Sequence, residues 1–126
     1  MAVKLNHTIV LARDREATAK FLVEIFGLAQ PKPFGPFLDV EVANEVTLAV
    51  IRSHTDDIQP QHYAFLVSEA EFDDILGRVK ARGLAFWADH MHRQQGEINR
   101  HDGGRGVYFD APDGHYLEII TRPYGG

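Results

Sequence analysis

The chain has no cysteine among its 126 residues, so disulfides, thiolate metal ligands and a cysteine nucleophile are all excluded. A metal site could then be built only from histidine and carboxylate side chains. An excess of positive charge is also missing, because 13 Lys and Arg against 18 Asp and Glu give a formal net charge of −5. Without a lysine- or arginine-rich block, we do not expect nucleic acid or an anionic membrane to be the main partner.

Long hydrophobic runs are absent too. No apolar stretch reaches the roughly 18–20 residues that a bilayer-spanning helix needs, and residues 1–7 contain no signal-peptide core. We therefore expect a soluble protein of the cytoplasm. The composition, with 44% hydrophobic and 25% charged residues, is typical of a globular protein that buries a core.

The first half of the chain predicts one strand, one helix and a run of short extended segments. Asp14 suits a helix N-cap and Gly27 suits a helix end, so a helix is expected between them, to Phe26. The expected elements are a strand at 5–12, this helix, a turn-rich connection or short edge strand at 31–36, and strands at 37–43 and 46–52.

The same order of elements then starts again. Ser68 and Glu71 have the spacing of a capping box, and Gly83 follows the expected end of a helix near Arg82. The expected elements are a strand at 62–67, this helix, a short strand near 85–90, a polar loop at 91–106, and strands at 106–110 and 115–121. The pattern β-α-β-β-β therefore occurs twice.

Two βαβββ modules predict an α+β fold in a single domain, 1–126, with module one at about 1–55 and module two at about 60–126. In such a unit the helix covers one face of a mixed sheet, and the other face curls around a cavity. Superposing His7 on His62 also aligns the two helices and the glycines that end them, which indicates a duplication. The alternative is that any two βα units look alike.

Three residues fall at corresponding places of the two modules. His7 and His62 open the first strands, and Glu118 lies in the last strand beside His62. Because side chains alternate between the two faces of a strand, we expect all three to face the cavity and to bind one metal ion. Each residue alone could be a satisfied polar side chain. An inward carboxylate within Tyr-Leu-Glu-Ile-Ile is costly, however, unless it is paired or bound to a metal.

Two imidazoles and one carboxylate on one side of a metal ion leave two or three coordination positions open. This facial arrangement suits Fe²⁺, with Mn²⁺, Ni²⁺, Co²⁺ or Zn²⁺ as alternatives. A small-molecule substrate could bind at the open positions through a pair of oxygens, where the ion acts as a Lewis acid.

Other polar residues are candidates for the same cavity. Tyr108 could donate a hydrogen bond or a proton, or it could be an ordinary half-buried strand tyrosine. His90 and His92 would share one face if both lay on a strand. With His101 they could form a second metal site, or they could line the cavity mouth as a polar loop. Arg105, in the long loop, could bind an anionic substrate or be solvated.

Three segments of the chain carry a resemblance to a known family: Leu5-Asn6-His7, His62-Tyr63-Ala64-Phe65, and Gly106-Val-Tyr-Phe-Asp-Ala-Pro-Asp-Gly-His-Tyr-Leu-Glu118. Together they resemble the vicinal oxygen chelate superfamily, which includes glyoxalase I, extradiol dioxygenases, and the fosfomycin- and bleomycin-resistance proteins. The resemblance covers nearly the whole chain. It implies paired βαβββ modules and a homodimer. In several small bacterial members one metal site draws ligands from two subunits, so the site of this chain could form either within one chain or between two.

The function implied by this resemblance is that of a divalent-metal-dependent enzyme of the glyoxalase/dioxygenase type, either a dioxygenase or a lyase or isomerase. Its substrate would be a small molecule that chelates the metal through vicinal oxygens. Ala49 stands where glyoxalase I-like enzymes usually have a carboxylate ligand, which argues against their activity. Tyr108 matches an active-site tyrosine of the fosfomycin-resistance proteins, whereas Ile9 replaces their threonine.

Two alternatives remain open at this point. One is a metal-free protein that binds a small molecule or an antibiotic, as bleomycin-resistance proteins do, and the other is a fosfomycin-modifying enzyme. The pocket of a binding protein would be lined by aromatic residues: Phe86, Trp87, Phe109 and Tyr116.

Overall fold

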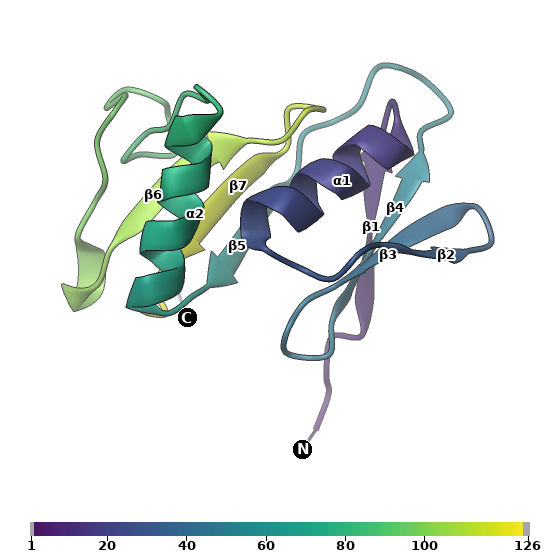
Figure 1. Ribbon diagram of the computed structural model, residues 1–126, viewed down its shortest axis with the longest axis horizontal. Helices are drawn as coiled ribbons and strands as arrows, with labels where there is room; N and C mark the ends of the chain where they lie inside the picture. Colours follow the sequence, from purple (N-terminus) through teal and green to yellow (C-terminus); the bar gives the residue numbers. More distant parts are fainter. Residues whose placement is uncertain (1, 125–126) are drawn as a thin grey trace. The chain divides into compact units, whose positions relative to one another are not determined.

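In a computed structural model, which describes residues 2–124, the chain divides into two compact units with a boundary between Gln59 and Pro60. Each unit contains one α-helix and one β-sheet (Figure 1). The predicted α+β class is therefore confirmed. Across the described residues, none of the helices combines the length and the apolar character that a membrane crossing requires.

The first unit contains a complete βαβββ module. Its elements are β1 (His7–Ala12), α1 (Arg15–Phe26), β2 (Lys32–Phe34), β3 (Phe37–Glu41) and β4 (Thr47–Arg52). The four strands form one sheet in the order β1-β4-β3-β2. β1 runs parallel to β4, and the other neighbours are antiparallel. The short edge strand predicted near 31–36 is thus confirmed as β2.

The helix α1 forms where its local signals predict it. The side chain of Asp14 accepts a hydrogen bond from the backbone N–H of Ala17 at 3.1 Å, and Gly27 ends the helix with a left-handed φ of 68°. The helix packs on β1, β3 and β4. In β1 it covers the side that buries Val10 and Ala12, so His7 lies on the opposite, open side of the sheet.

The second unit repeats this plan with one strand fewer. Its elements are β5 (His62–Leu66), α2 (Glu69–Ala81), the 3-10 turn η1 (His101–Gly103), β6 (Gly106–Asp110) and β7 (Tyr116–Ile120). The sheet has the order β5-β7-β6, with β5 parallel and β6 antiparallel to β7. α2 crosses in front of β6 and β7 in Figure 1.

The prediction of a strand near 85–90 is wrong. Within this segment only Trp87 pairs with the sheet, through two backbone hydrogen bonds of 2.9 and 2.8 Å with Tyr108. The chain then turns, because the carboxylate of Asp89 accepts hydrogen bonds from the backbone N–H groups of Arg93 and Gln94. A side chain that binds nearby backbone N–H groups offers the chain an alternative to a strand ladder. His92, with a φ of 59°, completes this turn.

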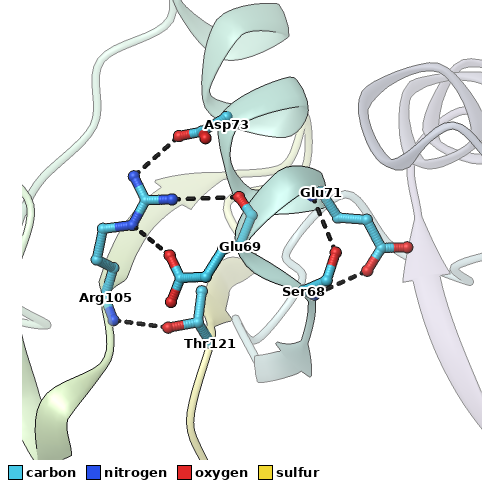
Figure 2. A network of polar contacts seen from close by, with 6 residues as sticks. All are labelled: Ser68, Glu69, Glu71, Asp73, Arg105 and Thr121. Atoms are coloured by element: carbon cyan, nitrogen blue, oxygen red, sulfur yellow. Dashed lines mark hydrogen bonds and ion pairs between the residues drawn. The ribbon is translucent and has the colours of Figure 1, made fainter.

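The start of α2 is held by the predicted capping box. The hydroxyl of Ser68 accepts a hydrogen bond from the backbone N–H of Glu71 at 3.1 Å, and the carboxylate of Glu71 accepts one from the backbone N–H of Ser68 at 2.8 Å (Figure 2). Both N–H groups would otherwise lack a partner at the helix end. The helix consequently begins at the residue that the sequence predicts.

Arg105 ties the same end of α2 to the edge of the sheet, as Figure 2 shows. Its guanidinium donates to the carboxylates of Glu69 at 2.7 Å and Asp73 at 2.9 Å. Its backbone N–H donates to the hydroxyl of Thr121, the first residue after β7, at 2.8 Å. Arg105 is therefore committed to the scaffold, and the structure does not leave its guanidinium for an anionic substrate.

Candidate metal centre

The strand register of the second unit places three polar side chains on one face. Glu118 in β7 lies directly opposite Tyr108 in β6 and Ala64 in β5. His62 shares a face with Ala64, because the two are separated by one residue in the same strand. The buried positions next to Glu118 in β7, Leu117 and Ile119, point to the other face and belong to the core.

His62 and Glu118 are in direct contact. Nε2 of His62 lies 2.8 Å from Oε1 of Glu118. The side chain of Glu118 is 1% exposed, whereas that of His62 is 38% exposed. Among the residues that the structure describes, no lysine or arginine pairs with this carboxylate. A buried carboxylate with no lysine or arginine beside it favours a cation at this place, either a protonated histidine or a metal ion.

The second carboxylate oxygen of Glu118 is bound by a residue that the sequence did not suggest. The hydroxyl of Tyr124 donates to Oε2 of Glu118 at 2.6 Å and lies 3.4 Å from the hydroxyl of Tyr108. Tyr124 follows the last strand and belongs to no periodic pattern. No local signal could therefore have identified it.

Tyr108 is held in its protonated form by its surroundings. Burial is the largest cause that raises its pKa above the ordinary value of 10.0, and the hydrogen bond with Tyr124 and the nearby Glu118 carboxylate raise it further. Its phenol is therefore neutral over the physiological pH range. In this state the hydroxyl can donate a hydrogen bond but cannot act as a ready base.

His90 lies beside this cluster. Its ring stacks on that of His62 with centroids 5.3 Å apart, and it meets the ring of Tyr108 edge-on at 6.0 Å. It reaches this position from a turn, so of the two alternatives the loop agrees with the structure and the shared strand face does not. His101 lies in η1 and is exposed. His90 is thus the one of these three histidines that the structure stacks against His62.

His92 takes part in a different set of contacts. Its ring stacks on Trp87 with centroids 3.7 Å apart, and its Nε2 lies 3.6 Å from Oδ1 of Asp110. Burial raises the pKa of Asp110, and the nearby His92 partly offsets this effect. These contacts fix the turn that carries His90. Phe109, expected above as a pocket residue, is fully buried on the other face of β6.

His7 lies in the first unit, on the open side of its sheet. It borders a hollow of about 320 Å³ whose lining includes the side chains of Ile9, Phe34, Phe37 and Ala49. Nδ1 of His7 is 2.8 Å from Oδ1 of Asn6. A ring nitrogen held by a carbonyl oxygen leaves the other nitrogen, Nε2, as a ligand atom.

The structure thus brings together two of the three predicted ligands, His62 and Glu118, within one unit. Over residues 2–124, no three histidine, cysteine or acidic side chains of this chain gather into a group able to hold a metal ion. The donor set nevertheless fits a divalent transition metal, because an imidazole nitrogen and a buried carboxylate oxygen, both ligand types of such ions, lie 2.8 Å apart.

A βαβββ module followed by a βαββ unit with a histidine–glutamate pair on one sheet face indicates the class of protein. Residues 4–119 match the model of the Glyoxalase/Bleomycin resistance protein/Dioxygenase superfamily. The chain belongs to this superfamily, as its resemblance to the vicinal oxygen chelate proteins predicted.

Three relatives illustrate where the chain lies within the superfamily. The solved structure of Oxidase ChaP-H1 is 62% identical, with a TM-score of 0.96, and the match covers 99% of this chain and 100% of that one. Oxidase ChaP-H2 is 56% identical with a TM-score of 0.96, over 100% of this chain and 98% of that one. Glutathione transferase FosA of Serratia marcescens is 27% identical in an alignment of 124 residues, which covers 94% of this chain and 81% of FosA. The similarity to proteins named as oxidases supports an enzyme.

Proposed function

We propose that this protein is a divalent-metal-dependent oxidase of the dioxygenase type, acting on a small molecule that chelates the metal through vicinal oxygens. The observation that carries the proposal is the buried carboxylate of Glu118, which has the imidazole of His62 at 2.8 Å and no lysine or arginine partner among the described residues. Full-length similarity to two proteins named as oxidases supports oxidation over lyase or isomerase chemistry.

The metal ligands in this proposal are His7, His62 and Glu118. A bound ion would supply Lewis-acid chemistry to a chelating substrate and, if it is Fe²⁺, redox chemistry toward oxygen. Fe²⁺ is our first choice because two histidines and one carboxylate would leave coordination positions open for both the substrate and oxygen. Ala49, at the edge of the hollow beside His7, offers no fourth ligand.

The remaining residues of the site would bind and orient the substrate. Tyr108, kept protonated by burial, would donate a hydrogen bond or a proton to a substrate oxygen. His90, stacked on His62 and exposed, would exchange a proton with the substrate or with solvent. The apolar side chains around the hollow at His7 would receive the hydrocarbon part of the molecule.

We also propose that the protein works as a homodimer, in which His7 of one chain joins His62 and Glu118 of the other. The family resemblance supports this arrangement.

Metal content, measured by mass spectrometry after purification without chelator or His-tag, tests the proposal. Wild type should contain about one transition metal ion per site, and Glu118→Gln, which keeps the shape of the side chain, should lose it. Oxygen uptake by the iron-loaded protein should then be sought with a panel of catechols and other adjacent-oxygen compounds. A wild type that stays empty after reloading with each ion would instead favour the metal-free binding protein.

A further inference from the structure

The carboxylate of Glu118 is bound from two directions by different residues. His62 contacts Oε1 at 2.8 Å, and the hydroxyl of Tyr124 donates to Oε2 at 2.6 Å. A distance of 2.6 Å is typical of a strong hydrogen bond from a hydroxyl to an ionised carboxylate. The two oxygens therefore have separate roles, since one faces the histidine and the other is engaged by the phenol.

The segment that carries Tyr124 is anchored three residues earlier. The hydroxyl of Thr121 accepts from the backbone N–H of Arg105 at 2.8 Å, and the backbone N–H of Thr121 donates to the carbonyl of Arg105 at 3.0 Å. Gly104 also lies so close that a Cβ there would come within 2.7 Å of Arg122. The chain after β7 is thus held close to the sheet edge, which directs Tyr124 back toward Glu118.

We propose that Tyr124 is a positioning residue for the metal ligand Glu118. By holding Oε2, it would leave Oε1, the oxygen on the side of His62, as the atom through which Glu118 binds a metal ion. The proposal rests on the function proposed above. A residue that hydrogen-bonds a ligating carboxylate fixes its orientation, and its loss typically weakens metal affinity by about 10- to 100-fold.

Tyr124 also lies near the proposed proton donor of the site, Tyr108, with the two hydroxyls 3.4 Å apart. At this distance the two hydroxyls are at the limit of hydrogen bonding, whereas the contact with Glu118 is short. Of these two contacts, the hydrogen bond to the Glu118 carboxylate therefore fixes the position of Tyr124. The proposed role of Tyr124 is to orient the metal ligand Glu118 and not to transfer a proton.

Co²⁺ binding to the full chain, followed by visible absorption and by competition with a chelator, tests this role. Tyr124→Phe removes only the hydroxyl, Glu118→Gln removes the charged ligand, and Tyr63→Phe is the matched control. Tyr63 lies on the opposite face of β5 from His62 and contacts the ring of His115. The melting temperature of each metal-free variant reports any general loss of structure.

We expect Tyr124→Phe to bind Co²⁺ about 10- to 100-fold more weakly than wild type. Its visible spectrum should also change, because the released Oε2 can join the coordination sphere. Tyr63→Phe should match wild type in both respects. If Tyr124→Phe has the affinity and the spectrum of wild type, the positioning role is overturned. If Glu118→Gln loses Co²⁺ binding in the same experiment, the proposed function is still supported. Absence of Co²⁺ binding by wild type would overturn both.

Discussion

Nε2 of His62 lies 2.8 Å from Oε1 of Glu118, although the two residues are 56 positions apart in the sequence. The parallel pairing of β5 and β7 brings them together, since Glu118 lies beside Ala64, the next residue of β5 on the face of His62. This pair is the part of the candidate metal centre that one unit of the chain builds by itself. Its completion by His7 can be tested by mixing subunits.

Mixed dimers should recover metal binding that neither variant has alone. If His7 completes the site of the partner chain, His7→Ala and Glu118→Gln homodimers each lack a ligand in both sites. After unfolding and refolding together, a heterodimer has one intact site and one that lacks both ligands. We expect about one metal ion per heterodimer by mass spectrometry. No recovery would show that each site is built within one chain, and a monomer in sedimentation equilibrium would contradict the dimer itself.

Replacement of Tyr108 by phenylalanine should reduce turnover without releasing the metal. The raised pKa of Tyr108 keeps its hydroxyl protonated, so the variant loses a donor but no metal ligand. We expect kcat to fall by about 10²- to 10⁴-fold. The measurement is steady-state oxygen uptake on a substrate found in the panel, with metal content determined on the same sample. Equal turnover in both proteins would leave Tyr108 as a structural tyrosine.

Loss of the capping hydroxyl of Ser68 should destabilise the second unit. Ser68→Ala leaves the backbone N–H of Glu71 without its partner at the start of α2. We expect the free energy of unfolding to fall by about 1 kcal/mol. Ser68→Thr keeps a hydroxyl and is the control, which should stay close to wild type in urea unfolding. A similar loss in both variants would mean that the cap is not the cause.

The ion pairs of Arg105 should make the stability of the protein depend on pH in the acidic range. Hydrogen bonds from Thr121 and Arg105 lower the pKa of Glu69 below its ordinary value of 4.5. A lowered pKa in the folded state means that the stabilisation is present above pH 4.5 and is lost as the pH falls through the folded-state pKa. Arg105→Met keeps an unbranched apolar side chain but removes the charged guanidinium, whose central carbon lies 4.3 Å from the centroid of the Phe72 ring.

Arg105→Met should therefore be less stable than wild type at neutral pH, and the difference should shrink as the solution is acidified below pH 4.5. Urea midpoints measured at a series of pH values give this comparison. Arg100→Met, at an exposed position of the same loop, is the matched control and should have little effect at any pH. A difference that does not change with pH would exclude the carboxylates as its source.

A methyl group at Gly104 should disturb the segment after β7. Its Cβ would lie 2.7 Å from the hydroxyl oxygen of Thr121 and 2.7 Å from Cγ of Arg122. Such overpacking typically costs about 1–3 kcal/mol. Gly77→Ala is the opposite case, because that position lies inside α2 and a Cβ there meets nothing within 4 Å. It should stabilise by about 0.5–1 kcal/mol. Thermal unfolding of both variants tests whether Gly104→Ala lowers the stability and Gly77→Ala raises it.

The helices could be predicted closely because their signals are local. Asp14 and the Ser68–Glu71 pair cap helix ends through contacts that span only three residues, and Gly27 ends a helix through its own φ. The strand near 85–90 could not be excluded in the same way. Its alternative, the turn around Asp89, depends on backbone N–H groups that approach the carboxylate only once the chain has bent.

By itself, the sequence determined both helices, the order of the elements in the first unit, and the strand faces on which His7, His62 and Glu118 lie, because strand alternation and helix capping are properties of neighbouring residues. Only the tertiary structure decided that the chain turns near Asp89, that Glu118 is buried with His62 beside it, that His90 stacks on His62, and that Arg105 is committed to α2. It alone also placed Tyr124 on Oε2 of Glu118. These contacts depend on strand register and on loop paths, and such long-range features have no signature in the local sequence.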